Sequence, residues 1–224
     1  MKLSPEELEK LKFSEEVINN IPPYSLEYMN RILDAYTLED FFKIDEEFIN
    51  KYKLPIDMKV SNDMKLIKLK LPCVLLLLPD DESKSGHYIA LAQNKDKNIL
   101  YYFDSFGYNP LKLWEEHPQM MGEKQNIDKW GEFLKQYDKV IFNDKKLQSD
   151  NSNICGCYCI TYIYEFNSRS IDLTPEIFAS LIIKTKDNYN LLSYDNALMI
   201  YYLKVITDLN LWYEEFNKNK KDFN

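Results

Sequence analysis

The middle of the chain alternates short apolar runs with charged and turn-forming segments. Three of these runs cover residues 73–78, 88–93 and 99–103, and a fourth covers 138–142. Apolar or alternating runs of this length, bounded by turn formers, are typical of β-strands. We therefore predict one central sheet, in which the first three strands are antiparallel neighbours.

Helical periodicity lies on both sides of this region. Residues 1–55 open with Ser4-Pro5-Glu6-Glu7, a capping residue followed by Pro and Glu, and we expect a helical N-terminal extension there. Further helices are predicted over about 127–137, from Ile154 or Cys155 onward, from Thr174 to about 184, and over 193–217. With no repeat and no long linker, residues 1–224 are expected to form a single domain of the α+β class, with a mixed or antiparallel sheet flanked by helices.

Composition narrows the range of functions. The 224 residues are 45% hydrophobic and 29% charged, with a net charge of -8 and only two arginines, Arg31 and Arg169. An acidic, arginine-poor chain is not expected to bind DNA. Because there is neither an apolar run long enough for a transmembrane helix nor a signal-like N-terminus, we expect no export and no membrane contact.

The four cysteines are expected to be reduced thiols. Cys155, Cys157 and Cys159 lie within five residues of one another, and the fourth is Cys73. One alternative is a zinc site formed by this cluster with Cys73 or His87. Its one-residue gaps suit tetrahedral ligation poorly, so we predict no metal and no other cofactor.

One set of residues has the chemistry of a cysteine nucleophile. Cys155 follows a turn-rich segment and begins a predicted helix, whose N-terminal partial charge favours a thiolate. His87 begins one predicted strand and Asp104 ends the next, so antiparallel pairing would bring their side chains together. Gln148, seven residues before Cys155, can donate its amide to an oxyanion. Each residue alone also fits an ordinary structural role; the combination predicts a nucleophilic site.

Three motifs resemble those of the adenovirus-protease-like (adenain-type) cysteine peptidases, which are grouped with the ubiquitin-like-protein-specific proteases. The motifs are Gly86-His87-Tyr88, the segment Tyr102-Phe103-Asp104-Ser105-Phe106-Gly107, and Gln148 followed by Cys155-Gly156-Cys157-Tyr158-Cys159. They span about 70–168, the expected protease core. The resemblance implies a papain-like core with permuted chain order. It also implies Cys155 as nucleophile, His87 as general base, Asp104 as orienting acid and Gln148 as oxyanion-hole donor.

Some positions depart from the family pattern. Tyr88 stands where the family commonly has Trp, and Asp104 stands where adenovirus enzymes carry Glu and the ubiquitin-like-protein proteases carry Asp. The pair Phe106-Gly107 favours the viral branch. His117 lies in a predicted loop and is expected to be a surface histidine.

The sequence and the resemblance together predict a viral cysteine endopeptidase that processes virion precursor proteins during maturation, at Gly-containing sites. Its substrates would be viral capsid or core precursor polypeptides. A peptide activator is a further possible partner. We expect it to come from a large DNA virus or virophage. It would act in the virion and in the host-cell cytoplasm or virus factory. Two alternatives stay open: a deubiquitinase or SUMO-like isopeptidase acting on host conjugates, and a non-catalytic capsid-binding protein.

Overall fold

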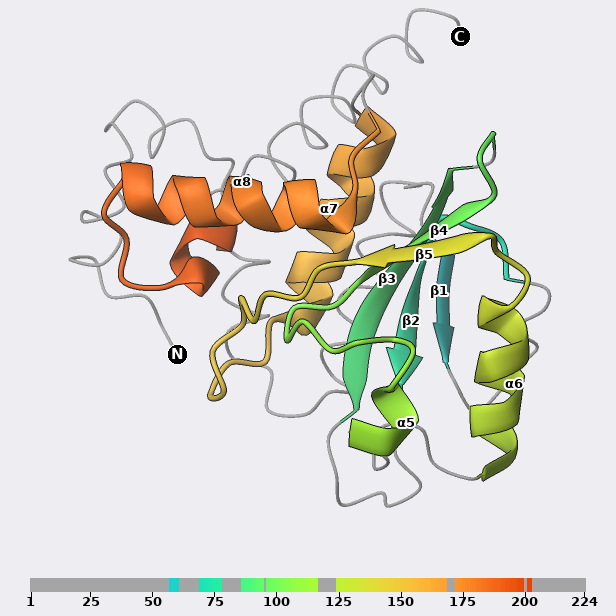
Figure 1. Cartoon of the computed structure of the whole chain (residues 1–224). Coiled ribbons are helices and arrows are strands. Elements are labelled where there is room, and N and C mark those ends of the chain that lie inside the picture. Colours follow the sequence, from blue (N-terminus) through green and yellow to red (C-terminus); the bar gives the residue numbers. More distant parts are fainter. Residues whose placement is uncertain are drawn as a thin grey trace, which may run out of the picture.

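A computed structural model describes residues 57–60, 69–77, 86–94, 96–116, 124–168, 172–199 and 201–202. The strands are β1 (Asp57–Val60), β2 (Cys73–Leu77), β3 (His87–Asn94), β4 (Ile99–Phe103) and β5 (Lys139–Phe142). The helices are α5 (Leu113–Glu116), α6 (Lys124–Leu134), α7 (Cys155–Ser168) and α8 (Pro175–Asn188), followed by helical residues 194–199 (Figure 1). The helical extension predicted over 1–55, the end of the helix predicted over 193–217, and His117 lie outside the described residues.

The five strands form one sheet in chain order. β2, β3 and β4 are antiparallel neighbours, with Leu77 opposite His87 and Ala90 opposite Phe103. The edge strands β1 and β5 run parallel to β2 and β4. The predicted α+β class is confirmed. The antiparallel arrangement predicted for β2, β3 and β4 is confirmed as well. Strand β1 was not predicted, because its four residues alternate too briefly to stand out.

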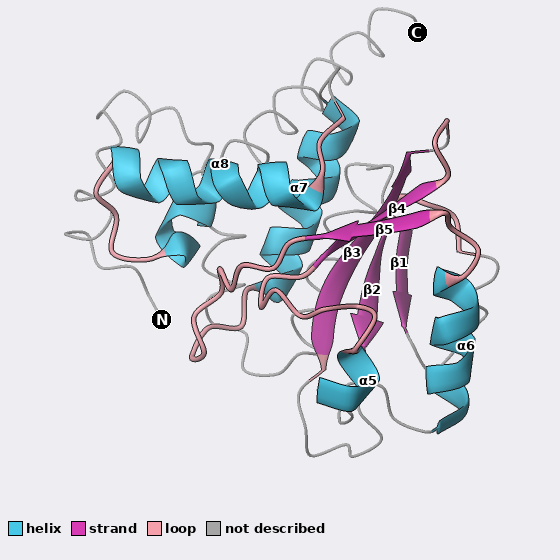
Figure 2. Ribbon diagram, in the orientation of Figure 1, coloured by secondary structure: helices cyan, strands magenta, loops and turns pink. Residues whose placement is uncertain are grey.

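Helices cover both faces of this sheet (Figure 2). Alternate side chains point to opposite faces of a strand, so Val74 and Leu76 pack with α7 and α8, while Cys73, Leu75 and Leu77 pack with α5 and α6. β2 is therefore buried along its whole length, which explains its uninterrupted apolar sequence. No helix among the described residues is long and apolar enough to span a bilayer.

Aromatic packing fixes α7 against the sheet. The Phe103 ring on β4 stacks on Tyr162 of α7 with centroids 5.1 Å apart, and Phe178 of α8 meets Phe103 edge-on at 5.1 Å. All three side chains are fully buried. This packing holds the first residue of α7, Cys155, at a fixed place relative to the strand ends.

A side-chain cap explains where α8 begins. α7 starts at Cys155, as predicted, and α8 follows Thr174, whose hydroxyl accepts a hydrogen bond from the Ile177 amide. α8 extends to Asn188, past the predicted end near 184, and α6 begins three residues before its predicted start. The single turn α5 was not predicted, since four residues carry no helical period.

A tight turn after β4 requires glycine at its last position. The Gly107 amide donates to the Asp104 carbonyl at 3.0 Å, and Gly107 has a φ of +72°. A Cβ on Gly107 would lie 2.7 Å from the carbonyl carbon of Lys145. Neither the backbone conformation nor the available space therefore accommodates another residue.

Replacing Gly107 by alanine should destabilise the fold. The left-handed conformation and the clash with Lys145 together predict a loss of at least about 2 kcal/mol in the free energy of unfolding, measured by urea denaturation. Gly131→Ala is the matched control, because a Cβ there meets no atom within 4 Å and Gly131 lies within α6. The free energy of unfolding of this control should rise by about 0.5 to 1 kcal/mol. Equal stability of Gly107→Ala and the wild type would contradict this description of the turn.

Candidate active site

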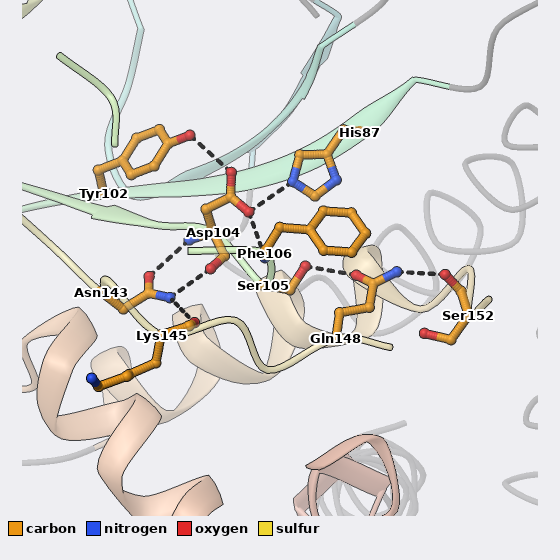
Figure 3. A network of polar contacts seen from close by, with 9 residues as sticks. All are labelled: His87, Tyr102, Asp104, Ser105, Phe106, Asn143, Lys145, Gln148 and Ser152. Atoms are coloured by element: carbon orange, nitrogen blue, oxygen red, sulfur yellow. Dashed lines mark hydrogen bonds and ion pairs between the residues drawn. The ribbon is translucent and has the colours of Figure 1, made fainter. Parts of the chain in front are cut away.

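A buried histidine and a buried aspartate meet where β3 begins and β4 ends. The His87 Nε2 atom lies 2.9 Å from Asp104 Oδ1, and the two residues are 2% and 0% exposed (Figure 3). The β3–β4 register, with Ala90 opposite Phe103, brings the start of one strand beside the end of the other. The pairing predicted for His87 and Asp104 is confirmed.

The Asp104 carboxylate is oriented by further donors. Its Oδ1 accepts the Phe106 amide at 2.7 Å, and its Oδ2 accepts the Tyr102 hydroxyl at 3.0 Å. Burial and the neighbouring Asp104 raise the pKa of Tyr102 well above its usual value, so this hydroxyl stays protonated and donates. With His87 as third partner, the carboxylate has little freedom to rotate.

Two hydrogen bonds with the Asn143 side chain fix the main chain of Asp104. Its amide donates to Asn143 Oδ1 at 3.0 Å, and Asn143 Nδ2 donates back to the Asp104 carbonyl at 2.6 Å. Asn143 directly follows β5 and is 1% exposed. Its side chain therefore pairs with the backbone of Asp104 much as a neighbouring strand would.

The charge state of His87 follows from its partners. Burial lowers the pKa of His87, but the charge of Asp104, the hydrogen bond to it and a side-chain hydrogen bond with Cys155 together raise the pKa from 6.5 to about 10. The ring is thus an imidazolium at neutral pH. Because Nε2 faces Asp104, Nδ1 is the nitrogen left to donate to Cys155.

Cys155 is the first residue of α7 and is 3% exposed. Its side chain shares a hydrogen bond with His87 and lies beside the partial positive charge of a helix N-terminus. Cys157 and Cys159, on the same helix, are fully buried in the core between α7 and the sheet. Both side chains therefore serve as packing residues of this core.

The alternative zinc site finds no support in this arrangement. Cys73 packs on the α5 and α6 side of the sheet, whereas Cys157 and Cys159 pack on the α7 side. No group of three or more His, Cys, Asp or Glu residues suitable for a metal ion occurs in the part of the chain that the structure describes.

The Gln148 side chain has a defined amide orientation. Its Oε1 accepts the Ser105 hydroxyl at 2.6 Å, and its Nε2 donates to the Ser152 carbonyl at 2.6 Å. A carbonyl can only accept, so the atom facing Ser152 must be the amide nitrogen. One of its two N–H groups is used there, and the second is left to meet a ligand.

The segment between Gln148 and Cys155 is tied to the C-terminal part of the described chain. The Asp195 carboxylate accepts the Ser149 amide at 3.3 Å through Oδ2 and the Tyr158 hydroxyl at 3.0 Å through Oδ1. Asp195 lies in the helical residues 194–199. Asp195 therefore links this segment to α7 at Tyr158, which lies three residues after Cys155.

Sequence reasoning missed several residues around the site. Asn143 directly follows β5, and Ser105 lies two residues after the end of β4. Polar residues at these positions are a signal that could have found them, and both are buried. The Phe106 ring packs on His87 with centroids 5.0 Å apart, and Lys146 Nζ lies 5.5 Å from the Phe106 centroid. Tyr88, which stands where the family commonly has Trp, is fully buried on the α7 side of the sheet.

The arrangement has the parts needed for attack by a thiol on a carbonyl. It combines a cysteine at a helix N-terminus, an imidazolium, an orienting carboxylate and an amide donor, which defines the class of α+β proteins with a cysteine–histidine–carboxylate site. The sequence model of the adenovirus endoprotease family matches residues 66–191, more than half of the chain. The chain belongs to the adenovirus endoprotease family. The match extends past residue 168, the predicted end of the core, and includes α8.

A curated relative is the protease of Bovine adenovirus B serotype 3. It is 25% identical to this chain over 114 residues, which is 48% of the chain and 54% of the relative. The chain therefore spans about half the length of the curated relative that it matches. The predicted resemblance to adenain-type peptidases is confirmed.

Replacing Asp104 by asparagine should lower the pKa of His87. The variant keeps the shape of the side chain but removes its charge, and loss of an adjacent opposite charge typically moves a pKa by about 1 to 3 units. Histidine Cε1–H NMR signals followed against pH measure the shift. The chain has only two histidines, so His117→Gln assigns the signals and the His117 signal is the internal control. An unchanged His87 pKa would show that Asp104 does not govern its charge.

Proposed function

We propose that this chain is a viral cysteine endopeptidase with Cys155 as nucleophile, His87 as acid and base, Asp104 as orienting acid and Gln148 as oxyanion donor. The observation that carries the proposal is the buried chain of contacts from Asp104 through His87 to Cys155. Membership of the adenovirus endoprotease family and similarity to the bovine adenovirus protease support it.

In the proposed reaction, the Cys155 thiolate attacks the carbonyl carbon of a peptide bond. The negative charge that develops on the carbonyl oxygen is stabilised by the second N–H of Gln148 and by the Cys155 amide at the start of α7. His87 gives the Nδ1 proton to the leaving amine, and the C–N bond breaks. Water then attacks the thioester, His87 accepts its proton, and the released thiolate pairs again with the imidazolium.

The contact of His87 with Asp104 suits this sequence of proton transfers. With its pKa raised to about 10, His87 keeps its proton until the leaving nitrogen lies at Nδ1 and accepts it. Asp104, bonded to Nε2, keeps the ring facing Cys155 in both charge states. Its other donors, Tyr102 and the Phe106 amide, fix the carboxylate in turn.

Finer features of the proposal rest on family resemblance. They are a papain-like core with permuted chain order, a single catalytic domain over 1–224, virion precursor polypeptides as substrates, and cleavage beside glycine. A peptide activator, and action in the virion and in the host-cell cytoplasm or virus factory, belong to the same proposal. The family match and the viral relative support these features, and the net charge of -8 argues against DNA as an activator.

Cleavage profiling tests the proposal directly. The wild type and Cys155→Ala are incubated with a proteome-derived peptide library, and new termini are identified by mass spectrometry. We expect cuts by the wild type at glycine-containing sites and none by Cys155→Ala, since the thiolate is the attacking group.

The matched control is Cys157→Ala, the same substitution two residues along α7. Cys157 is fully buried in the core, so this variant should lose some stability but keep the cleavage pattern. Identical profiles for wild type and Cys155→Ala would contradict the nucleophile assignment. Cleavage lost equally in both variants would assign the effect to α7 packing.

The two alternative functions are outcomes of parallel tests. Labelling of Cys155 by ubiquitin or SUMO carrying a C-terminal electrophile, with no cuts in the peptide library, would favour the isopeptidase. Neither cutting nor labelling would favour a capsid-binding protein. The contacts of His87 with Asp104 and Cys155, and the raised pKa of His87, argue against a catalytically inactive site.

A further inference from the structure

Ser105 links the turn that carries Asp104 to the side chain of Gln148. It is fully buried, and its hydroxyl donates to Gln148 Oε1 at 2.6 Å (Figure 3). Its carbonyl accepts the Leu147 amide at 2.8 Å and the Gln148 amide at 2.9 Å. Ser105 therefore makes hydrogen bonds with both the backbone and the side chain of Gln148.

These contacts decide which end of the Gln148 amide faces the site. The two ends of a glutamine amide have nearly the same shape, and a half rotation exchanges Oε1 with Nε2. In the observed orientation a hydroxyl donates to the oxygen and the Ser152 carbonyl accepts from the nitrogen. The rotated amide would place its oxygen against the Ser152 carbonyl oxygen, where neither can donate.

Without the Ser105 hydroxyl, Gln148 Oε1 would lose this donor. Gln148 is only 3% exposed, so water has little access to satisfy the oxygen in its place. The side chain would then turn to find another donor. That movement would carry Nε2 away from the place where an oxyanion forms.

We propose that Ser105 is a positioning residue for the oxyanion donor: its hydroxyl holds the Gln148 amide so that one Nε2–H faces the carbonyl oxygen of the substrate. This inference deepens the proposed function and rests on it. Ser105 directly follows Asp104, so one turn orients both the partner of His87 and the donor to the oxyanion.

The kinetic signature of this role is specific. An oxyanion donor acts in the transition state and hardly in the ground state, so its misplacement lowers kcat and leaves KM near its wild-type value. Alkylation of Cys155 by iodoacetamide forms no oxyanion. Its rate reports the thiolate and His87 and should not depend on Ser105.

The test measures kcat and KM on a peptide that the wild type cuts, for Ser105→Ala, Gln148→Ala and the double variant. Loss of an oxyanion donor lowers kcat by about 10² to 10³, and we expect a fall of about tenfold for Ser105→Ala, since it misplaces the donor without removing it. In the Gln148→Ala background, Ser105→Ala should cause no further fall. The iodoacetamide rate should match the wild type in all three variants.

The matched control is Ser180→Ala, which removes an equivalent hydroxyl from α8. The Ser180 hydroxyl donates to the Glu176 carbonyl at 2.8 Å on the exposed side of the helix. This variant should keep wild-type kcat. If Ser105→Ala shifts the urea midpoint strongly, Ser105→Cys fills nearly the same space with a much weaker donor, and its kcat should fall as well.

The outcomes separate the two proposals. A wild type that cuts no peptide contradicts the proposed function, and the role of Ser105 with it. Two results with a wild type that cuts would overturn the role of Ser105 and leave the proposed function standing. One is a wild-type kcat for Ser105→Ala, and the other is an equal loss of kcat on adding Ser105→Ala to the wild type and to Gln148→Ala. A parallel loss of iodoacetamide reactivity would assign Ser105 to the His87 turn instead.

Discussion

The buried contact between His87 and Asp104 is the interaction on which the rest of the site depends. It exists because β3 and β4 pair in one register, which brings the start of one strand beside the end of the next. The Tyr102 hydroxyl and the Phe106 amide then fix the Asp104 carboxylate, and Asn143 holds the backbone of Asp104. The histidine in turn meets the first residue of α7, whose position is set by aromatic packing against β4. A one-residue slip between β3 and β4 would separate all of these groups.

The charge state that suits the proposed chemistry also stabilises the fold. A histidine whose pKa rises from 6.5 in the unfolded chain to about 10 in the folded protein adds stability that is fully present below pH 6.5. This contribution is lost as the pH rises through about 10. The imidazolium is thus retained across the neutral range, even though burial alone would remove its proton. The Asp104 and Cys155 side chains supply the compensating negative charge.

Much of this arrangement could be predicted from the sequence, because the decisive signals are local. Apolar runs placed β2 to β5, the turn-rich segment before Cys155 placed the start of α7, and adjacent strands implied the contact of His87 with Asp104. The pattern did not reveal Ser105, Asn143 or Phe106 as partners. Their contacts join segments about 40 residues apart or depend on a turn whose course periodicity does not encode. Strand β1 and helix α5 were missed because four residues are too few for a period.

The central claim is that Cys155, alone among four buried cysteines, is an activated nucleophile paired with His87. The most direct measurement is the rate of iodoacetamide labelling at each cysteine of the folded protein, resolved by mass spectrometry, for the wild type and His87→Ala. Cys155 should react far faster than Cys73, Cys157 and Cys159, and His87→Ala should remove this advantage. Equal reactivity of Cys155 and its neighbours in the wild type, or an advantage that persists without His87, would contradict the central claim.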